Sequence, residues 1–321
     1  MSVRTFKQDA HASGAPSRGL PGGGSADILV AASLWGTTGT VRTFADGASS
    51  VSVAAIRIVI GGLVLLACAA LTRRGAGLRR LLSPVPADRA SGLRRCGAWP
   101  LIGLGAVAIA VYQMAFFVSV ARTGVAVGTV VTIGSAPAFA GLIGLALRRA
   151  VLTPRWLAAT GGAVAGCALL IGGGQDAGVE PVGIALALLS GLSYAVYATV
   201  ASSLITRGED GRAVAGALFA AAAVLLLPVL LAGPTGWLLT GPGALTALYL
   251  GAVTTGGGYL LFARGLRTTS ATTATTLTLA EPAVAAILGT LVLDERLGLA
   301  ALGGLALLAA SLVVLMLPVR E

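Results

Sequence analysis

The chain has 321 residues, of which 56% are hydrophobic and only 11% are charged, with a mean hydropathy of +0.92. A soluble domain carries roughly a quarter charged residues, so this composition excludes an ordinary soluble protein. The net charge of +10 does not indicate a nucleic-acid partner, because the arginines lie between apolar runs, without a basic domain or interleaved aromatic residues.

The apolar residues come in runs of about twenty, each ending in Gly, Pro, Arg or Thr. A helix rising 1.5 Å per residue needs about 20 residues to cross the ~30 Å hydrocarbon core. The sequence therefore predicts an all-α integral membrane protein, preceded by a disordered cytoplasmic tail over residues 1–26. We expect ten transmembrane helices, over about 27–45, 50–71, 98–121, 124–147, 156–173, 182–205, 213–232, 244–266, 269–293 and 298–318.

The distribution of Lys and Arg among the short loops sets the orientation in the membrane. With the N-terminus inside, 18 of the 22 Lys and Arg residues fall on the inner side. Arg42, Arg122 and Arg296 fall outside, and Arg57 lies within the second span. We therefore expect both termini in the cytoplasm. The 21 arginines against a single lysine, together with abundant alanine, favour the inner membrane of a bacterium with a GC-rich genome.

Residues 117–152 align without a gap onto residues 262–297. The alignment superimposes Arg122-Thr123 on Arg267-Thr268 and Pro137-Ala138 on Pro282-Ala283. Five spans in each half give the two copies opposite membrane orientations, an arrangement typical of secondary transporters. The sequence thus predicts two inverted five-helix repeats, over residues 27–173 and 182–318.

Several segments of these repeats carry a family resemblance. They are LWGTTGTVR (34–42), VAAIRIVIGGL (53–63), SYAVYATVAS (193–202), LYLGAVTTGGGYLLFARGL (248–266) and TLAEPAVAAILGTLVLDERL (278–297). Over residues 27–318 the chain resembles the EamA-type members of the drug/metabolite transporter superfamily. The resemblance implies ten spans around a central cavity, with amino acids and related compounds as common substrates.

One segment departs from the family pattern. The first repeat of the family usually ends its fourth helix in an acidic Gly-Glu-Arg-like turn. Here the chain reads LALRRAVLTPR (145–155), and Ala150 stands opposite Glu295. A two-fold role for that glutamate is therefore absent. Asp294, Glu295 and Arg296 are predicted to form a local cap before the last span.

Glu281 lies near the middle of the ninth span, where an acid costs roughly 2.5–3.5 kcal/mol even on the mildest insertion scale. Its neighbour Pro282 removes a backbone donor and frees a carbonyl at about residue 278. One interpretation is a polar site that binds a substrate amine or carries a proton. The alternative is structural, with the carboxyl group bonded to Thr or Tyr hydroxyls of a neighbouring helix.

Arg57, seven residues into the second span, must also pair or reach a polar region. It is a candidate for recognising a substrate carboxylate or for pairing with Glu281, although it could equally cap backbone carbonyls. Bulky amphipathic side chains need room and a polar partner among so many Ala and Gly residues. The candidate cavity-lining residues are therefore Trp35, Tyr112, Gln113, Tyr194 and Tyr259.

Two Thr-rich segments remain ambiguous. The run TTSATTATTLT (268–278) could line a polar path to Glu281 or bond to its own helix carbonyls. The segment TTGGG (254–258) is predicted to form a flexible or closely packed stretch of helix. It lacks the strand–loop–helix context and the lysine of a phosphate loop.

Three classes of function compete. We expect a secondary transporter, proton-coupled or uniporting, that exports small metabolites such as amino acids and contacts membrane lipids. A multidrug or organic-cation effluxer of the same fold is the alternative within transport. A membrane transferase would need metal ligands or a base at the membrane surface, and a scaffold or sensor would not need charges at midplane. The three cysteines and the single histidine, His11, show no metal-ligand spacing, so no metal or cofactor is expected.

Overall fold

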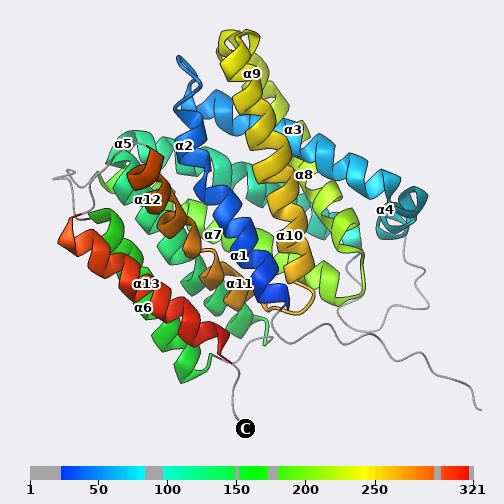
Figure 1. Cartoon of the computed structure of the whole chain (residues 1–321). Coiled ribbons are helices and arrows are strands. Elements are labelled where there is room, and N and C mark those ends of the chain that lie inside the picture. Colours follow the sequence, from blue (N-terminus) through cyan, green and yellow to red (C-terminus); the bar gives the residue numbers. More distant parts are fainter. Residues whose placement is uncertain (1–22, 84–96, 149–151, 173–179, 293–297, 318–321) are drawn as a thin grey trace, which may run out of the picture.

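The computed structural model describes residues 23–83, 97–148, 152–172, 180–292 and 298–317, and all regular structure in these ranges is helical (Figure 1). The helices are α1 (Gly23–Gly36), α2 (Thr38–Arg42), α3 (Ser50–Leu71), η1 (Thr72–Gly75), α4 (Ala76–Leu82), α5 (Ala98–Ala146), α6 (Pro154–Gly172), α7 (Pro181–Thr206), α8 (Gly211–Ala232), η4 (Gly236–Leu239), α9 (Gly241–Leu248), η5 (Tyr249–Gly257), α10 (Gly258–Gly265), α11 (Ala271–Leu277), α12 (Ala280–Val292) and α13 (Leu299–Met316).

Eight helices in the described part of the chain are long and apolar enough to cross a membrane. They account for eight of the ten predicted spans. The other two predicted spans fall on α6 and on α1 with α2, where the 14-residue α1 is too short to cross a bilayer alone. The predicted tail at 1–26 and cap at 294–296 lie largely or wholly outside the described residues, although α1 already begins at Gly23.

Helix α5 holds two of the predicted spans in a single helical run of 49 residues. A Cβ built on Gly128 would lie 2.9 Å from the side chain of Val120. Residues eight apart in a straight helix are separated by about 12 Å along its axis, so the chain must reverse between them. The arms Ala98–Thr123 and Gly128–Ala146 are accordingly two separate candidate spans.

The surface of the bundle is strongly apolar. Leu63, Val224 and Leu291 are 60%, 70% and 74% exposed, and they belong to a much larger set of exposed Leu and Val side chains. A soluble protein rarely exposes so many, whereas lipid solvates them at no cost. Together with the eight apolar spans, this surface identifies a multi-pass membrane protein.

Small residues hold the helices together. Helix α3 packs against α8, and α6 against α13, while α5 packs against α7 and α1 against α10 and α12 (Figure 1). A Cβ on Gly62 of α3 would lie 2.6 Å from the carbonyl oxygen of Phe219 in α8. Gly166 of α6 and Gly304 of α13 are in equally close mutual contact. Backbones approach this closely only where side chains are missing, as is typical of helices packed in membranes.

Polar side chains secure the helix ends. Ser49 caps α3, Glu180 caps α7 and Asp210 caps α8, each accepting a hydrogen bond from a backbone N–H of the first turn.

At one end of the bundle an ion pair of 3.1 Å joins Arg264 to Asp27. That end, which also carries Arg80, Arg212 and Arg267, is referred to below as the basic end.

Candidate functional site

A small cavity lies inside the bundle. Its described lining residues are Trp35, Arg57, Tyr112, Thr132, Ile133, Tyr194, Tyr259, Thr278 and Glu281. Six of the seven residues singled out in the sequence are therefore brought together in one place. Gln113 is also buried but is not among the described lining residues. Adjacent helical residues point about 100° apart, so Gln113 faces away when its neighbour Tyr112 faces the cavity.

Glu281 lies at a break in its span. Helix α11 ends at Leu277 and α12 begins at Ala280, so Glu281 lies in the first turn of a new helix. The amide of Glu281 donates to the carbonyl of Thr278 at 3.0 Å, as expected where Pro282 cannot supply its own N–H. The start of a helix favours negative charge, which makes this a favourable place for a carboxylate inside an apolar bundle.

Arg57 is held from one side only. Its Nε donates to the hydroxyl of Thr255 at 3.2 Å, and that hydroxyl donates in turn to the carbonyl of Leu250 at 2.8 Å. The other nitrogens of the Arg57 guanidinium make no hydrogen bond or ion pair with any other described residue. They remain available to a partner that enters the cavity.

The two opposite charges of the cavity are not paired with each other. Among the described residues no ion pair joins Arg57 to Glu281, and the Glu281 carboxylate accepts no hydrogen bond from another side chain. Both groups nevertheless line the same cavity and act on each other electrostatically. Unpaired charges in an apolar bundle are costly, and each of these two groups has capacity left to bind an opposite charge.

Aromatic rings form one wall of the cavity. The ring centroids of Trp35 and Tyr259 are 4.7 Å apart, and those of Tyr112 and Tyr194 are 5.4 Å apart. The Tyr194 hydroxyl is buried and faces Thr278 without forming a well-directed hydrogen bond to any described residue. It is therefore a further polar group that a ligand could satisfy.

The segment TTGGG, predicted to be flexible or closely packed, belongs in part to a π-helix, η5. In a π-helix some carbonyls lose their usual partners, and π-helical turns are frequent at functional sites. Here the carbonyl of Thr254 accepts a hydrogen bond of 2.9 Å from the indole Nε1 of Trp35 in α1. This contact joins η5 to α1 directly beside the cavity.

Trp35→Phe should therefore destabilise the protein by about 1 kcal/mol, since it removes this buried hydrogen bond. Trp99→Phe is the matched control, because the Trp99 indole also donates to a carbonyl, that of Leu82, but is exposed. Thermal unfolding of both variants in detergent measures the difference. Equal losses of stability would show that the Trp35 contact is no stronger than a surface contact.

The sequence did not single out Thr132, Ile133, Thr255 or Thr278 as site residues. Thr278 is the last residue of the Thr run, close to Pro282, and Thr255 directly precedes the three glycines of TTGGG. A polar residue beside a Gly or Pro helix break was therefore the only sequence pattern that could have pointed to these two residues. In the Thr run, Thr275, Thr276 and Thr278 all donate to carbonyls of their own helix, which supports the local-bonding interpretation for that part.

The start of the Thr run lines a second cavity, the hydroxyl-lined pocket, with an empty volume of about 1030 Å³. It lies between α7, the second arm of α5 and the segment between α10 and α11. Its polar lining includes Thr199, Ser202, Thr206, Arg267, Thr269 and Thr272. The pocket contains Arg267 and is therefore at the basic end. The Thr run, which begins in this pocket, leads through α11 to α12, the helix that carries Glu281.

The apolar spans and the enclosed cavity with two opposite charges define a polytopic membrane protein with an internal polar site. The sequence profile of the EamA-like transporter family matches residues 24–172 and 181–317. The chain therefore belongs to the EamA-like transporter family of the drug/metabolite transporter superfamily, and it is a membrane transporter.

Individual proteins agree with this assignment. The chain is 37% identical over 289 residues to a Bacillus subtilis protein described as the uncharacterised transporter YwfM, covering 90% of this chain and 92% of that protein. It is 32% identical over 270 residues to the uncharacterised Pseudomonas aeruginosa protein PA1977, covering 81% and 84%. A solved crystal structure shares the fold, with a TM-score of 0.74 at 22% identity over 92% of this chain and 97% of the other.

Proposed function

We propose that this protein is a secondary active transporter that exports amino acids or closely related zwitterions across the inner membrane. The observation that carries the proposal is the cavity in which Arg57 and Glu281 face the same space without pairing. A guanidinium binds a carboxylate well, and a carboxylate binds an ammonium group. An α-amino acid supplies both groups, and the aromatic wall suits an apolar or aromatic side chain.

The proposed architecture is ten spans in two inverted five-helix repeats, with both termini in the cytoplasm. Helix contacts support it. In this arrangement the first half, α1, α3, the two arms of α5 and α6, corresponds in order to α7, α8, α9–α10, α11–α12 and α13. Exchanging the halves then maps the contact of α5 with α7 onto the contacts of α1 with α10 and α12. It also maps the α3–α8 and α6–α13 contacts onto themselves. Inverted halves of this kind can exchange conformations in alternating access.

Glu281 can couple export to a proton gradient. A carboxyl group holds either a proton or the ammonium group of a substrate, so the two compete for one position. Binding the amino acid on the inner side and the proton on the outer side would give exchange. The hydroxyl-lined pocket, next to the proposed cytoplasmic end, is the proposed entrance from the cytoplasm.

Flux in proteoliposomes tests the substrate class. Three matched compounds should be compared, namely phenylalanine, its amide, which lacks the carboxylate, and its N-acetyl form, which lacks the ammonium group. We expect saturable flux of the amino acid that responds to an imposed pH gradient and exceeds the flux of either derivative at least tenfold. That ratio corresponds to one lost charge-assisted hydrogen bond, about 1.5–3 kcal/mol.

The same assay tests the alternative of an organic-cation effluxer, which Glu281 and the aromatic wall would also suit through cation–π contacts. In that case the amide would move as fast as the amino acid or faster. Leucine and threonine extend the panel to smaller side chains. If these zwitterions do not exceed protein-free liposomes while organic cations do, the amino-acid assignment is wrong.

A further inference from the structure

A second charged site lies at the basic end, apart from the cavity that contains Arg57 and Glu281. It is an open groove with an empty volume of about 1750 Å³ between α3, α8 and α10. Four arginines of the described chain line it, namely Arg73, Arg212, Arg264 and Arg267, against a single described carboxylate, that of Asp210. We call it the arginine groove. It shares Arg267 with the hydroxyl-lined pocket but contains neither Glu281 nor Arg57.

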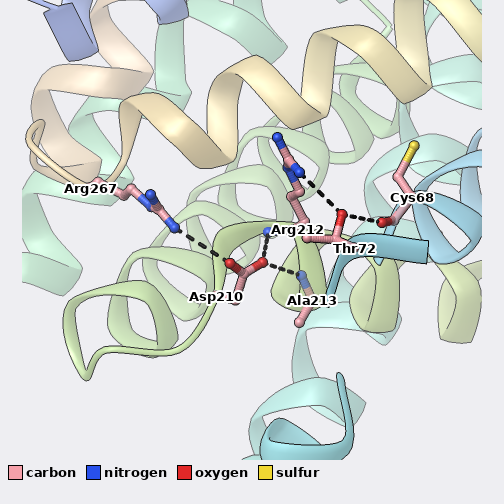
Figure 2. Close-up of polar contacts among 6 residues, drawn as sticks. All are labelled: Cys68, Thr72, Asp210, Arg212, Ala213 and Arg267. Carbon is pink, nitrogen blue, oxygen red and sulfur yellow. Dashed lines mark hydrogen bonds and ion pairs between the residues drawn. The ribbon is translucent and has the colours of Figure 1, made fainter. Parts of the chain in front are cut away.

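The polar contacts within the arginine groove leave an excess of positive charge (Figure 2). The Oδ1 atom of Asp210 accepts from the amides of Arg212 and Ala213, and its Oδ2 atom pairs with Arg267 at 3.6 Å. Arg212 donates to the hydroxyl of Thr72 at 3.1 Å, a neutral partner. Asp210 is thus occupied by the helix start and by Arg267, and Asp27, outside the groove lining, pairs with Arg264 at 3.1 Å. Arg73 and Arg212 are left without a carboxylate among the described residues.

Arg73 is the most available of these cations. It is exposed and makes no hydrogen bond or ion pair with any other described residue. Its backbone is left-handed, with φ 47°, and Arg74 follows with φ 53° and Gly75 with φ 71°. Left-handed backbone costs a non-glycine residue roughly 1–2 kcal/mol, so two consecutive arginines in this conformation are unusual. The turn directs the chain away from the axis of α3 and places Arg73 at the groove.

The rest of the groove wall is apolar and belongs to helices that span the membrane. Leu71, which is 82% exposed, extends it at the end of α3, and Leu260 and Leu261 of α10 lie opposite. A free inorganic anion would need the arginines alone. A ligand with a negatively charged head and a hydrocarbon tail would use both parts of the wall.

From this combination we propose that the arginine groove binds an anionic phospholipid of the cytoplasmic leaflet, with its phosphate at Arg73 and Arg212 and an acyl chain along Leu71 and Leu260. Basic pockets between membrane helices on the cytoplasmic side suit phosphate head groups. A head group such as that of phosphatidylglycerol carries no amine to offset its phosphate, so it matches the excess charge. Phosphatidylcholine, with its own cation, does not.

The test is the stabilisation of the purified protein in detergent by added phosphatidylglycerol, measured as the thermal unfolding temperature. Arg73→Asn is the diagnostic variant, because Asn tolerates left-handed backbone well and the substitution should not harm folding. Arg74→Asn is its matched control, with the same backbone conformation but outside the groove. We expect half-maximal stabilisation to need about fivefold more phosphatidylglycerol in Arg73→Asn, the contribution of one arginine near a membrane, and no change in Arg74→Asn.

Three outcomes would overturn the proposal. Equal losses in the two variants would mean diffuse attraction rather than a groove. Equal stabilisation by phosphatidylcholine would mean that the head group is not recognised, and equal stabilisation by glycerol 3-phosphate would mean an anion site without a lipid. A separate measurement on the unaltered protein uses phosphatidylglycerol with a photoreactive acyl chain. Cross-links at residues 68–71 or 260–261 support the site, and cross-links confined to other helices contradict it.

Discussion

Glu281→Gln is expected to lower amino-acid flux about 10- to 100-fold, the range for losing a hydrogen bond to a charged group. The same variant should lose its response to an imposed pH gradient. Glutamine keeps the size of the side chain and one acceptor oxygen, but it can neither bind a proton nor carry a negative charge. Both the attraction for a substrate ammonium group and the competition with protons therefore disappear.

The kinetic pattern distinguishes a substrate site from a structural role. The Glu281 carboxylate makes no hydrogen bond or ion pair with another described residue, so its replacement removes no contact that holds the fold. We accordingly expect an unchanged unfolding temperature together with the loss of flux. Glu209→Gln is the matched control, because it makes the same substitution at a glutamate near the basic end, paired with Arg80 at 3.9 Å. A Glu281→Gln protein that transports normally, or that fails only because it unfolds, would contradict the assigned role.

The residues at the cavity could be predicted where the free energy of placing a side chain in lipid is high enough to be inferred from the sequence. A carboxylate beside a proline, and a guanidinium inside a span, are expensive in lipid wherever they lie, so Glu281 and Arg57 were identifiable without coordinates. The same reasoning reached Trp35 and the tyrosines, because large amphipathic rings need space in a chain so rich in Ala and Gly.

The partners of these residues could not be predicted in this way. Thr255, which bonds Arg57, lies in the π-helix η5, which packs against α3 and α1. Neither the π-helical turn nor this packing is visible in the sequence. Thr132 lies in the second arm of α5, and a threonine within a span costs too little free energy to stand out in the sequence. Similarly, nothing in the sequence distinguishes Arg73 from its neighbours, because its left-handed backbone appears only in the folded chain.

The junction of α6 and α13 gives the second large effect, this time on stability. Gly304→Ala should destabilise the protein by about 1–3 kcal/mol, the usual range for overpacking. A Cβ on Gly304 would lie 2.4 Å from the backbone nitrogen of Leu170 and 2.6 Å from the carbonyl oxygen of Gly166. Both obstacles are backbone atoms, so no side chain can rotate away and the two helices must separate.

Gly303→Ala is the matched control, because a Cβ on Gly303 has open space around it. Alanine favours a helix over glycine by up to about 1 kcal/mol, so this variant should be neutral or slightly more stable. The same substitution at these neighbouring glycines should thus lower the unfolding temperature at Gly304 and leave it unchanged or slightly raised at Gly303. Since no described residue of α6 or α13 lines the cavity that contains Arg57 and Glu281, flux per folded molecule should stay unchanged in both variants. Equal unfolding temperatures for the two would mean that α6 and α13 do not pack through Gly304, and a selective loss of flux in Gly304→Ala would mean that this junction moves during transport.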